Sequence, residues 1–262
     1  EGVALWEKPY GDSLCVEWGT SISVFADGYM IAGYQAANQF DDDFFFLKTD
    51  LDGDLTWQKS YGTADRERAL SIDKTSDGGF ILGGYREKAT STERDAFLIK
   101  INADGDVLWE NTQGTEEFNE TVYSIMEAAN GDILGVGVAR PHVAASEEDL
   151  VYVIRMSAAG ELLWENRYHQ SGINEGRCIV EDPEGDLMIC GQHFSDNAIH
   201  ISKLDAEGNF QWSDSSHVNG YGMSMLPEAP GYVISGSTTY PNHSELNDVL
   251  ILKVVEDLTN LE

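Results

Sequence analysis

A repeat of about fifty residues constrains the fold of this chain more than any other feature of its sequence. Successive copies are marked by tryptophans at Trp6, Trp57, Trp109, Trp164 and Trp212, which are 51, 52, 55 and 48 residues apart. Repetition at such a period is typical of folds in which one supersecondary unit packs against the next.

Each unit reads as four short antiparallel strands. In the second copy, the period of two runs along 67–75, 80–86, 95–101 and 107–113; turns that contain glycine join the first two and the last two segments, and a longer polar loop joins the second to the third. Alternation predicts strands, and no segment has the period of an amphipathic helix. Four strands joined as a meander form one blade of a propeller. We therefore predict an all-β fold, a five-bladed β-propeller of four-stranded antiparallel blades.

The two ends of the chain supply complementary parts of one unit. The first residues, "EGVALWEKPYG", correspond to the last strand of a unit, whereas "DVLILKVVEDLTNLE" stops before that strand. We expect the N-terminal strand to complete the C-terminal blade, because this closes the ring without a long exposed edge. The single domain, 1–262, then has blades at 17–60, 67–112, 120–167, 174–215, and 220–255 with 2–9.

The charge of the chain excludes some partners. Forty-six acidic residues against sixteen basic ones give a formal net charge of −30. Such a surface repels nucleic acid and anionic membranes, and no apolar run reaches the roughly 18 residues that span a bilayer. The acidic excess also predicts a solvated surface suited to a salt-rich, halophilic setting, where screening shortens the repulsion between like charges.

Several repeated segments resemble a known group of proteins. "DGGFILGG" (77–84), "DAFLIKINADGDVLW" (95–109) and the "YG" at 61–62 resemble the repeat of secreted and surface-attached bacterial and archaeal β-propellers. These are distantly similar to quinoprotein-type and lectin-type propellers. The resemblance covers the whole chain, more weakly in the fourth and fifth units. It implies an extracellular, cell-surface or periplasmic location and a role in binding or display.

Two sets of recurring residues are interpreted as scaffold. The tryptophans are expected to fill the space between blades. One base recurs in every unit, and we expect it to pair with a nearby acid. These bases are Lys48, Lys100, Arg155, Lys203 and Lys253. Cys178 and Cys190 lie almost symmetrically about a turn, so they are either two buried thiols or a bridge across one hairpin.

The innermost strands carry the candidate metal site. Glu17, Glu67 and Glu120 each stand five residues before an apolar anchor of the strand that lines the channel. Three carboxylates near one mouth would need water, protons or a cation between them, which makes them the candidate cation site, with calcium as the candidate ion. The favoured interpretation is that each carboxylate points sideways and caps a neighbouring loop. No other cofactor is expected.

The long loops of all units are predicted to end on one side of the propeller, which we call the long-loop face. Loops held by rigid strands are where binding residues concentrate. The residues predicted to form the partner site on this face are Trp18, Phe40, Asp42, Phe118, Asn174, His193 and Tyr240.

No nucleophile triad, phosphate loop, CxxC pair or metalloprotease helix is found in the sequence. We therefore predict a non-catalytic binding or assembly module that holds a protein or glycan partner, within a larger surface complex. Two alternatives remain, a glycoside-acting enzyme that uses Glu67 and Glu120, and a calcium-dependent lectin with several equivalent sites. Glycoside hydrolysis needs two carboxyl groups in unlike environments, which equivalent positions on repeated blades do not readily supply.

Overall fold

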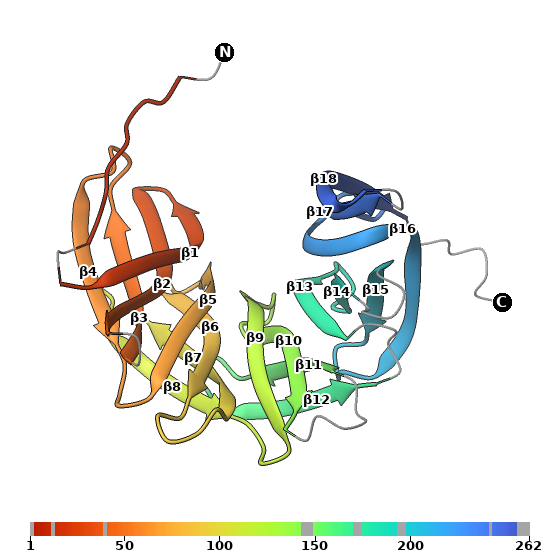
Figure 1. The fold of residues 1–262 in the computed structure, drawn as a ribbon, viewed down its shortest axis with the longest axis horizontal. Helices are drawn as coiled ribbons and strands as arrows, with labels where there is room; N and C mark the ends of the chain where they lie inside the picture. The colour runs from red at the N-terminus through yellow and green to blue at the C-terminus, as the bar shows by residue number, and fades with distance from the viewer. Residues whose placement is uncertain are drawn as a thin grey trace.

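The predicted all-β fold is confirmed. The structure, a computed structural model, describes residues 3–11, 14–38, 41–142, 149–169, 174–192, 198–240 and 243–255. Its regular elements are antiparallel strands that follow one another as blades around an axis (Figure 1). Throughout the described ranges, no helix long and apolar enough to cross a membrane is present.

The first three blades are separate four-stranded sheets in which neighbouring strands follow chain order. The first contains β1 (Val16–Phe25), β2 (Gly28–Asn38), β3 (Asp41–Thr49) and β4 (Leu55–Tyr61). The second contains β5 (Arg66–Lys74), β6 (Phe80–Glu87), β7 (Arg94–Ile101) and β8 (Val107–Gln113). The third contains β9 (Phe118–Glu127), β10 (Ile133–Pro141), β11 (Leu150–Met156) and β12 (Leu162–Tyr168).

The fourth and fifth blades form one continuous sheet. It contains β13 (Glu175–Glu181), β14 (Leu187–Gln192), β15 (Ala198–Leu204), β16 (Phe210–Pro227), β17 (Tyr232–Tyr240) and β18 (His243–Val254). The long strand β16 pairs with β15 over its first half and with β17 over its second half. It is therefore both the outer strand of the fourth blade and the inner strand of the fifth, which has three strands in the described part.

The hydrophobic core lies between successive blades. Phe44 of the first blade packs against Phe97 of the second, with ring centroids 5.1 Å apart. Along the axis, the N–H group of Ile72 donates to the Ser21 hydroxyl of the preceding inner strand, at 3.3 Å. Each blade thus buries the apolar face of its neighbour, as expected for a chain of repeated units.

The tryptophans fill the space between blades, as predicted. Trp57 covers Gly105 in a turn of the next blade, where φ is +78° and a Cβ atom would lie 2.7 Å from the indole ring. Glycine is therefore required at this turn both for its left-handed backbone and for the contact with the ring. The equivalent contacts are Trp6 on Gly53, Trp109 on Gly160 and Trp164 on Gly208.

The repeated bases also behave as predicted. Lys100 pairs with Asp77 at 2.8 Å, and Arg155 pairs with Asp132 at 2.9 Å, in each case across the sheet of one blade. The other pairs are Lys48 with Asp27, Lys203 with Asp182, and Lys253 with Glu228. These ion pairs lie at the end of the blades opposite to the long-loop face, where the short turns are.

The expected closure of the ring is not seen. The N-terminal segment is not a strand beside β18, and Figure 1 shows an open gap between the first and fifth blades. Instead, Trp6 packs on Tyr29 at 5.9 Å, the Lys8 ammonium lies 2.6 Å from Asp54, and the Tyr10 hydroxyl donates to the Gly53 carbonyl at 2.6 Å. These contacts hold the segment on the first blade and explain its position.

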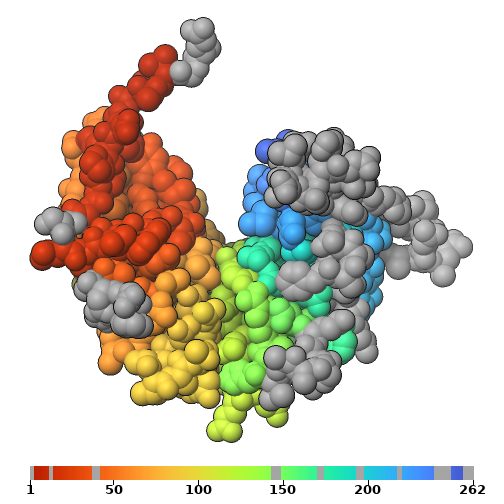
Figure 2. Space-filling view, in the orientation of Figure 1, coloured from red at the N-terminus to blue at the C-terminus, as the bar shows by residue number. Residues whose placement is uncertain are grey.

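The open ring leaves apolar surface exposed on both sides of the gap. Ile22 is 59% exposed, whereas Ile72, at the same position of the second blade, is 6% exposed because the first blade covers it. Val249 and Ile251 of β18 are exposed on the other side. Figure 2 shows the molecule hollowed between these two blades, so the first and fifth blades present the faces that other blades bury.

Candidate functional site

The predicted inner-strand carboxylates are buried and tied to their own loops. Glu67 accepts hydrogen bonds from the Thr63 hydroxyl at 2.7 Å and from Arg86 Nε at 2.8 Å. Glu120 accepts from the Thr115 hydroxyl at 3.1 Å and from Arg167 Nε at 3.1 Å. Each carboxylate therefore holds the loop that leads into its strand, as in the capping interpretation.

The arginine that neutralises each carboxylate comes from a different strand in each blade. Arg86 lies on the second strand of its blade and stacks on Phe97 at 4.0 Å, whereas Arg167 lies on the fourth strand and stacks on Tyr152 at 5.2 Å. Phe97 and Tyr152 are equivalent residues, each three positions before the repeated base. Burial raises the pKa of Glu120, although Arg167 and Thr115 oppose that effect.

Glu17 differs from these two residues because it is partly exposed, at the edge of the open ring. Its carboxylate lies against Gly11 of the N-terminal segment. Glu67 and Glu120 find their positive partners in arginines. Among the residues that the structure describes, no group of three His, Cys, Asp or Glu side chains could hold a metal ion. The cation site at Glu17, Glu67 and Glu120 stays a prediction.

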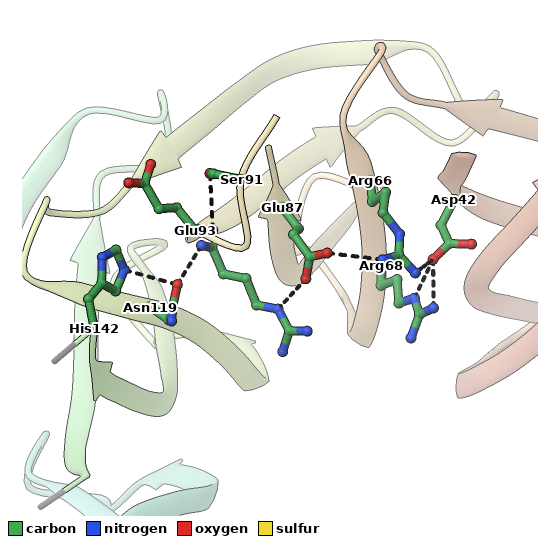
Figure 3. A network of polar contacts seen from close by, with 9 residues as sticks. Asp42, Arg66, Arg68, Glu87, Ser91, Glu93, Asn119 and His142 are labelled. Atoms are coloured by element: carbon green, nitrogen blue, oxygen red, sulfur yellow. Dashed lines mark hydrogen bonds and ion pairs between the residues drawn. The ribbon is translucent and has the colours of Figure 1, made fainter. Parts of the chain in front are cut away.

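Asp42, one of the predicted partner-site residues, is the first member of a network of ion pairs on the long-loop face. Its buried carboxylate accepts from Arg68 Nε at 2.7 Å and lies 3.2 Å from Arg66 Nη2. Both arginines lie at the start of β5, in the next blade. Figure 3 shows Asp42 at one end of this network and His142 at the other.

The network continues across the second blade into the third. Glu87, at the end of β6, lies 3.0 Å from Arg66 Nη1 and 2.6 Å from Arg94 Nε. The backbone N–H of Arg94 donates to the side-chain oxygen of Asn119 at 2.7 Å, and His142 Nε2 lies 3.0 Å from the same oxygen (Figure 3). Polar contacts thus link three blades along this face.

A second group of ion pairs joins the third and fourth blades. Arg140 Nε lies 3.0 Å from Asp149, and its Nη2 atom contacts Glu175. Arg177, two residues along β13, also pairs with Glu175. Asp149 is 23% exposed and Glu175 is 1% exposed, so two carboxylates from neighbouring blades share one guanidinium in unlike surroundings.

Aromatic rings hold the planes of these arginines. Arg68 lies over Tyr34 at 4.5 Å, Arg94 over Tyr85 at 4.7 Å, and Arg177 over Tyr123 at 4.2 Å. A guanidinium that stacks on a ring keeps its N–H donors at its edge, where they remain able to bond.

The structure brings three of the predicted partner-site residues to this face. Trp18 is half-exposed and stacks on Tyr34 at 4.8 Å, next to Arg68. Phe118 begins β9, and Arg167 lies 5.5 Å from the centroid of its ring. Asn174 is buried and donates its side-chain N–H to the Asp149 carbonyl at 2.9 Å.

Three other predictions cannot be compared with side-chain positions. Phe40 and His193 lie outside the described residues, and for Tyr240 only the backbone, at the end of β17, is described.

Sequence reasoning missed the arginines of the long-loop face. Seven of the eight arginines in the chain lie within three residues of the strand ends at this face. They are Arg66, Arg68, Arg86, Arg94, Arg140, Arg167 and Arg177. The sequence did contain a pattern that could have revealed them, because most arginines stand beside the long loops. Lys59 and Lys100, in contrast, pair with acids of the short turns at the opposite end.

Comparison with known proteins yields structural similarity alone. No family model matches the chain, and no curated protein matches it. The fold is similar to hydrazine synthase of Kuenenia stuttgartiensis, with a TM-score of 0.58 and 12% identity over 96% of this chain and 66% of that one. It is also similar to an exo-β-1,3-galactanase of Phanerochaete chrysosporium bound to β-1,3-galactotriose, with a TM-score of 0.54 and 9% identity over 89% and 59%.

A further structure of that galactanase, with galactose, gives a TM-score of 0.53 at 9% identity over the same shares of the two chains. This chain therefore spans about three fifths to two thirds of these proteins, and identities this low show the fold alone. The galactanase nevertheless carries glycoside chemistry on this fold, which contradicts our prediction of a non-catalytic module and favours the glycoside-acting alternative.

The long-loop face also removes the physical objection to an enzyme. We expected equivalent positions to present equivalent groups, yet Asp149 precedes a third strand and Glu175 begins a first strand. The residue that follows the inner-strand position of Glu17, Glu67 and Glu120 also differs from blade to blade, as Trp18, Arg68, Thr121, Glu175 and Tyr221. A repeated scaffold therefore carries an unsymmetrical face.

Proposed function

We propose that this chain is a glycoside-acting enzyme whose substrate binds on the long-loop face. The observation that carries the proposal is the bridge from Asp149 through Arg140 to Glu175. It brings two carboxyl groups from neighbouring blades to one guanidinium, where the third and fourth blades meet. The similarity in fold to the galactanase supports the proposal without identifying the substrate.

The pair has the composition that the reaction needs. Asp149 and Glu175 bond to Nε and Nη2 of the same guanidinium, so two carboxyl groups lie close together on this face, and glycoside hydrolases use two neighbouring carboxyl groups. One carboxyl group must donate a proton to the leaving oxygen, and the other must act as base or nucleophile.

The surroundings of the two groups assign their roles. Glu175 contacts two guanidiniums, Arg140 and Arg177, and takes the role of base or nucleophile in this proposal. Asp149 has one guanidinium contact and is 23% exposed, so it is the group that meets the leaving oxygen of a bound substrate. Glu67 and Glu120 each bond to the threonine hydroxyl of their own loop, which makes them parts of the scaffold in this proposal.

A second bridge of the same chemistry supplies the control. Arg66 joins Asp42 to Glu87 between the first and second blades, but neither carboxylate is as exposed as Asp149. Asp42→Asn therefore removes a charge of the same kind without touching the proposed chemistry.

The test is release of reducing sugar from a panel of polysaccharides by the wild-type protein, Asp149→Asn and Asp42→Asn. We expect turnover by the wild type, a loss of about 10³-fold or more in kcat for Asp149→Asn, and a loss below about tenfold for Asp42→Asn. Circular dichroism confirms that each variant is folded. A folded wild type that cleaves no member of the panel, or an Asp149→Asn variant as active as the control, contradicts the proposal.

A further inference from the structure

The two ion-pair networks of the long-loop face expose their arginines more than most of their carboxylates. Its two ion-pair networks contain five arginines, which are Arg66, Arg68, Arg94, Arg140 and Arg177. Their four carboxylate partners are Asp42, Glu87, Asp149 and Glu175. The arginine side chains are 27–42% exposed, whereas three of the four carboxylates are at most 9% exposed.

Within these two networks the guanidinium groups are therefore more accessible than most of the carboxylates that balance them. Exposed carboxylates of the neighbouring loops, such as Glu93 and Glu117, lie on the same face, so an anion is recognised here by hydrogen bonds to individual guanidiniums.

Several donors of these arginines are unused. Arg94 donates through Nε to Glu87, and none of the described residues accepts a hydrogen bond from its two Nη atoms. Arg177 uses only Nη2, toward Glu175. Arg66 Nε is buried and lacks a partner within the described part of the chain. The free donors of Arg94 and Arg177 can therefore bond to a ligand, and a buried donor such as Arg66 Nε costs free energy when it has no partner.

The stacked tyrosines fix these donors in place. Arg94 on Tyr85 and Arg177 on Tyr123 present the edge of a planar group whose orientation the ring holds. A fixed guanidinium edge matches a carboxylate through two parallel hydrogen bonds. The same face carries the proposed glycoside chemistry between the third and fourth blades.

We propose that the substrate is a glycan with uronic acid units, whose carboxylates bind Arg94 and Arg177 near the Asp149 and Glu175 pair. This inference rests on the proposed function in taking the long-loop face as a sugar site. Arg94 lies on the second blade and Arg177 on the fourth, so a glycan with carboxylates on more than one sugar unit suits both arginines.

Calorimetric titration with uronate trisaccharides and with the same trisaccharides after reduction of each carboxyl to an alcohol tests the inference. We expect the uronates to bind at least about tenfold more tightly, with affinity that falls as salt rises. Arg94→Gln and Arg177→Gln should each weaken uronate binding by about tenfold and leave the reduced sugars unaffected. Lys59→Gln, which removes the same charge near a short turn, should change neither.

Equal affinity for the acidic and reduced sugars overturns the inference, as does a sulfated neutral trisaccharide that binds as tightly as the uronate. Thermal unfolding shows whether Arg94→Gln and Arg177→Gln are folded. If one of them is not folded, the binding data of the other variant test the inference. A wild type that binds uronates but releases no sugar refutes the enzyme proposal and supports this one. A wild type that cleaves neutral glycans but does not bind uronates supports the enzyme proposal and refutes this inference.

Discussion

Replacement of Arg167 by methionine should destabilise the protein by an amount that depends on pH. The change removes the guanidinium that pairs with Glu120, whose side chain is fully buried. An uncompensated buried carboxylate costs about 3–5 kcal/mol in free energy of unfolding. The Thr115 hydroxyl still donates to it at 3.1 Å, so we expect about 3 kcal/mol at pH 7.

The pH dependence follows from the pKa of Glu120, which burial already raises in the wild type. A raised pKa in the folded state means that stability is greatest below the ordinary pKa and is lost as the pH rises through the folded value. Loss of Arg167 raises this pKa further. The loss in free energy of unfolding caused by Arg167→Met should therefore become smaller by about 1.4 kcal/mol for each pH unit below the pKa of Glu120 in the variant. This trend ends when the pH reaches the ordinary pKa of a glutamate.

Urea unfolding followed by tryptophan fluorescence at pH 5, 6 and 7 measures this deficit. The double variant Glu120→Gln/Arg167→Met should recover most of the lost stability, because the buried charge has gone. A deficit below about 1 kcal/mol at pH 7, or a double variant no more stable than Arg167→Met, refutes the reasoning.

Three further predictions concern the scaffold. Ile22→Ala should lower the free energy of unfolding by less than about 1 kcal/mol and Ile72→Ala by about 2–5 kcal/mol, because only Ile72 is buried. Urea unfolding measures both values, and equal losses would mean that the ring closes in solution. The hydrogen bond from Lys100 lowers the pKa of Asp77 to about 2, so its contribution to stability is present above pH 3.8 and is lost as the pH falls through 2. In Lys100→Met, an NMR titration should return that pKa toward 3.8, and an unchanged value argues against the pair. Hydrogen bonds from Cys190 and from the Met225 N–H lower the pKa of Cys178 to about 7. Iodoacetamide should therefore label Cys178 before Cys190 at pH 7.5. Labelling of Cys190 first would contradict this prediction.

Features that repeat could be predicted from the sequence. The tryptophan at the outer strand and the base at the third strand recur because every blade meets the same neighbour in the same way, as the contacts of Trp57 and Lys100 show. Asp42 was selected for its place in a loop and does lie in the arginine network. Cys178 and Cys190 are opposite each other in adjacent strands and are both free thiols.

Features that differ between blades could not be predicted in this way. Arg86 and Arg167 perform the same task from different strands, so no alignment of repeats places them together. Asp149 and Glu175 occupy positions that are not equivalent, and only the packing of the third blade on the fourth brings them to one guanidinium. The open ring could not be predicted because "WEKPYG" (6–11) is similar to "WQKSYG" (57–62), which belongs to the outer strand of a blade. This similarity does not show whether the N-terminal segment pairs with β18.

The most direct test of the account is a crystal structure of the Asp149→Asn variant soaked with a uronate oligosaccharide. The account predicts a sugar on the long-loop face, within hydrogen-bonding distance of residue 149 and Glu175. A sugar bound at the short-turn end, or on the exposed face of the first or fifth blade, would contradict it.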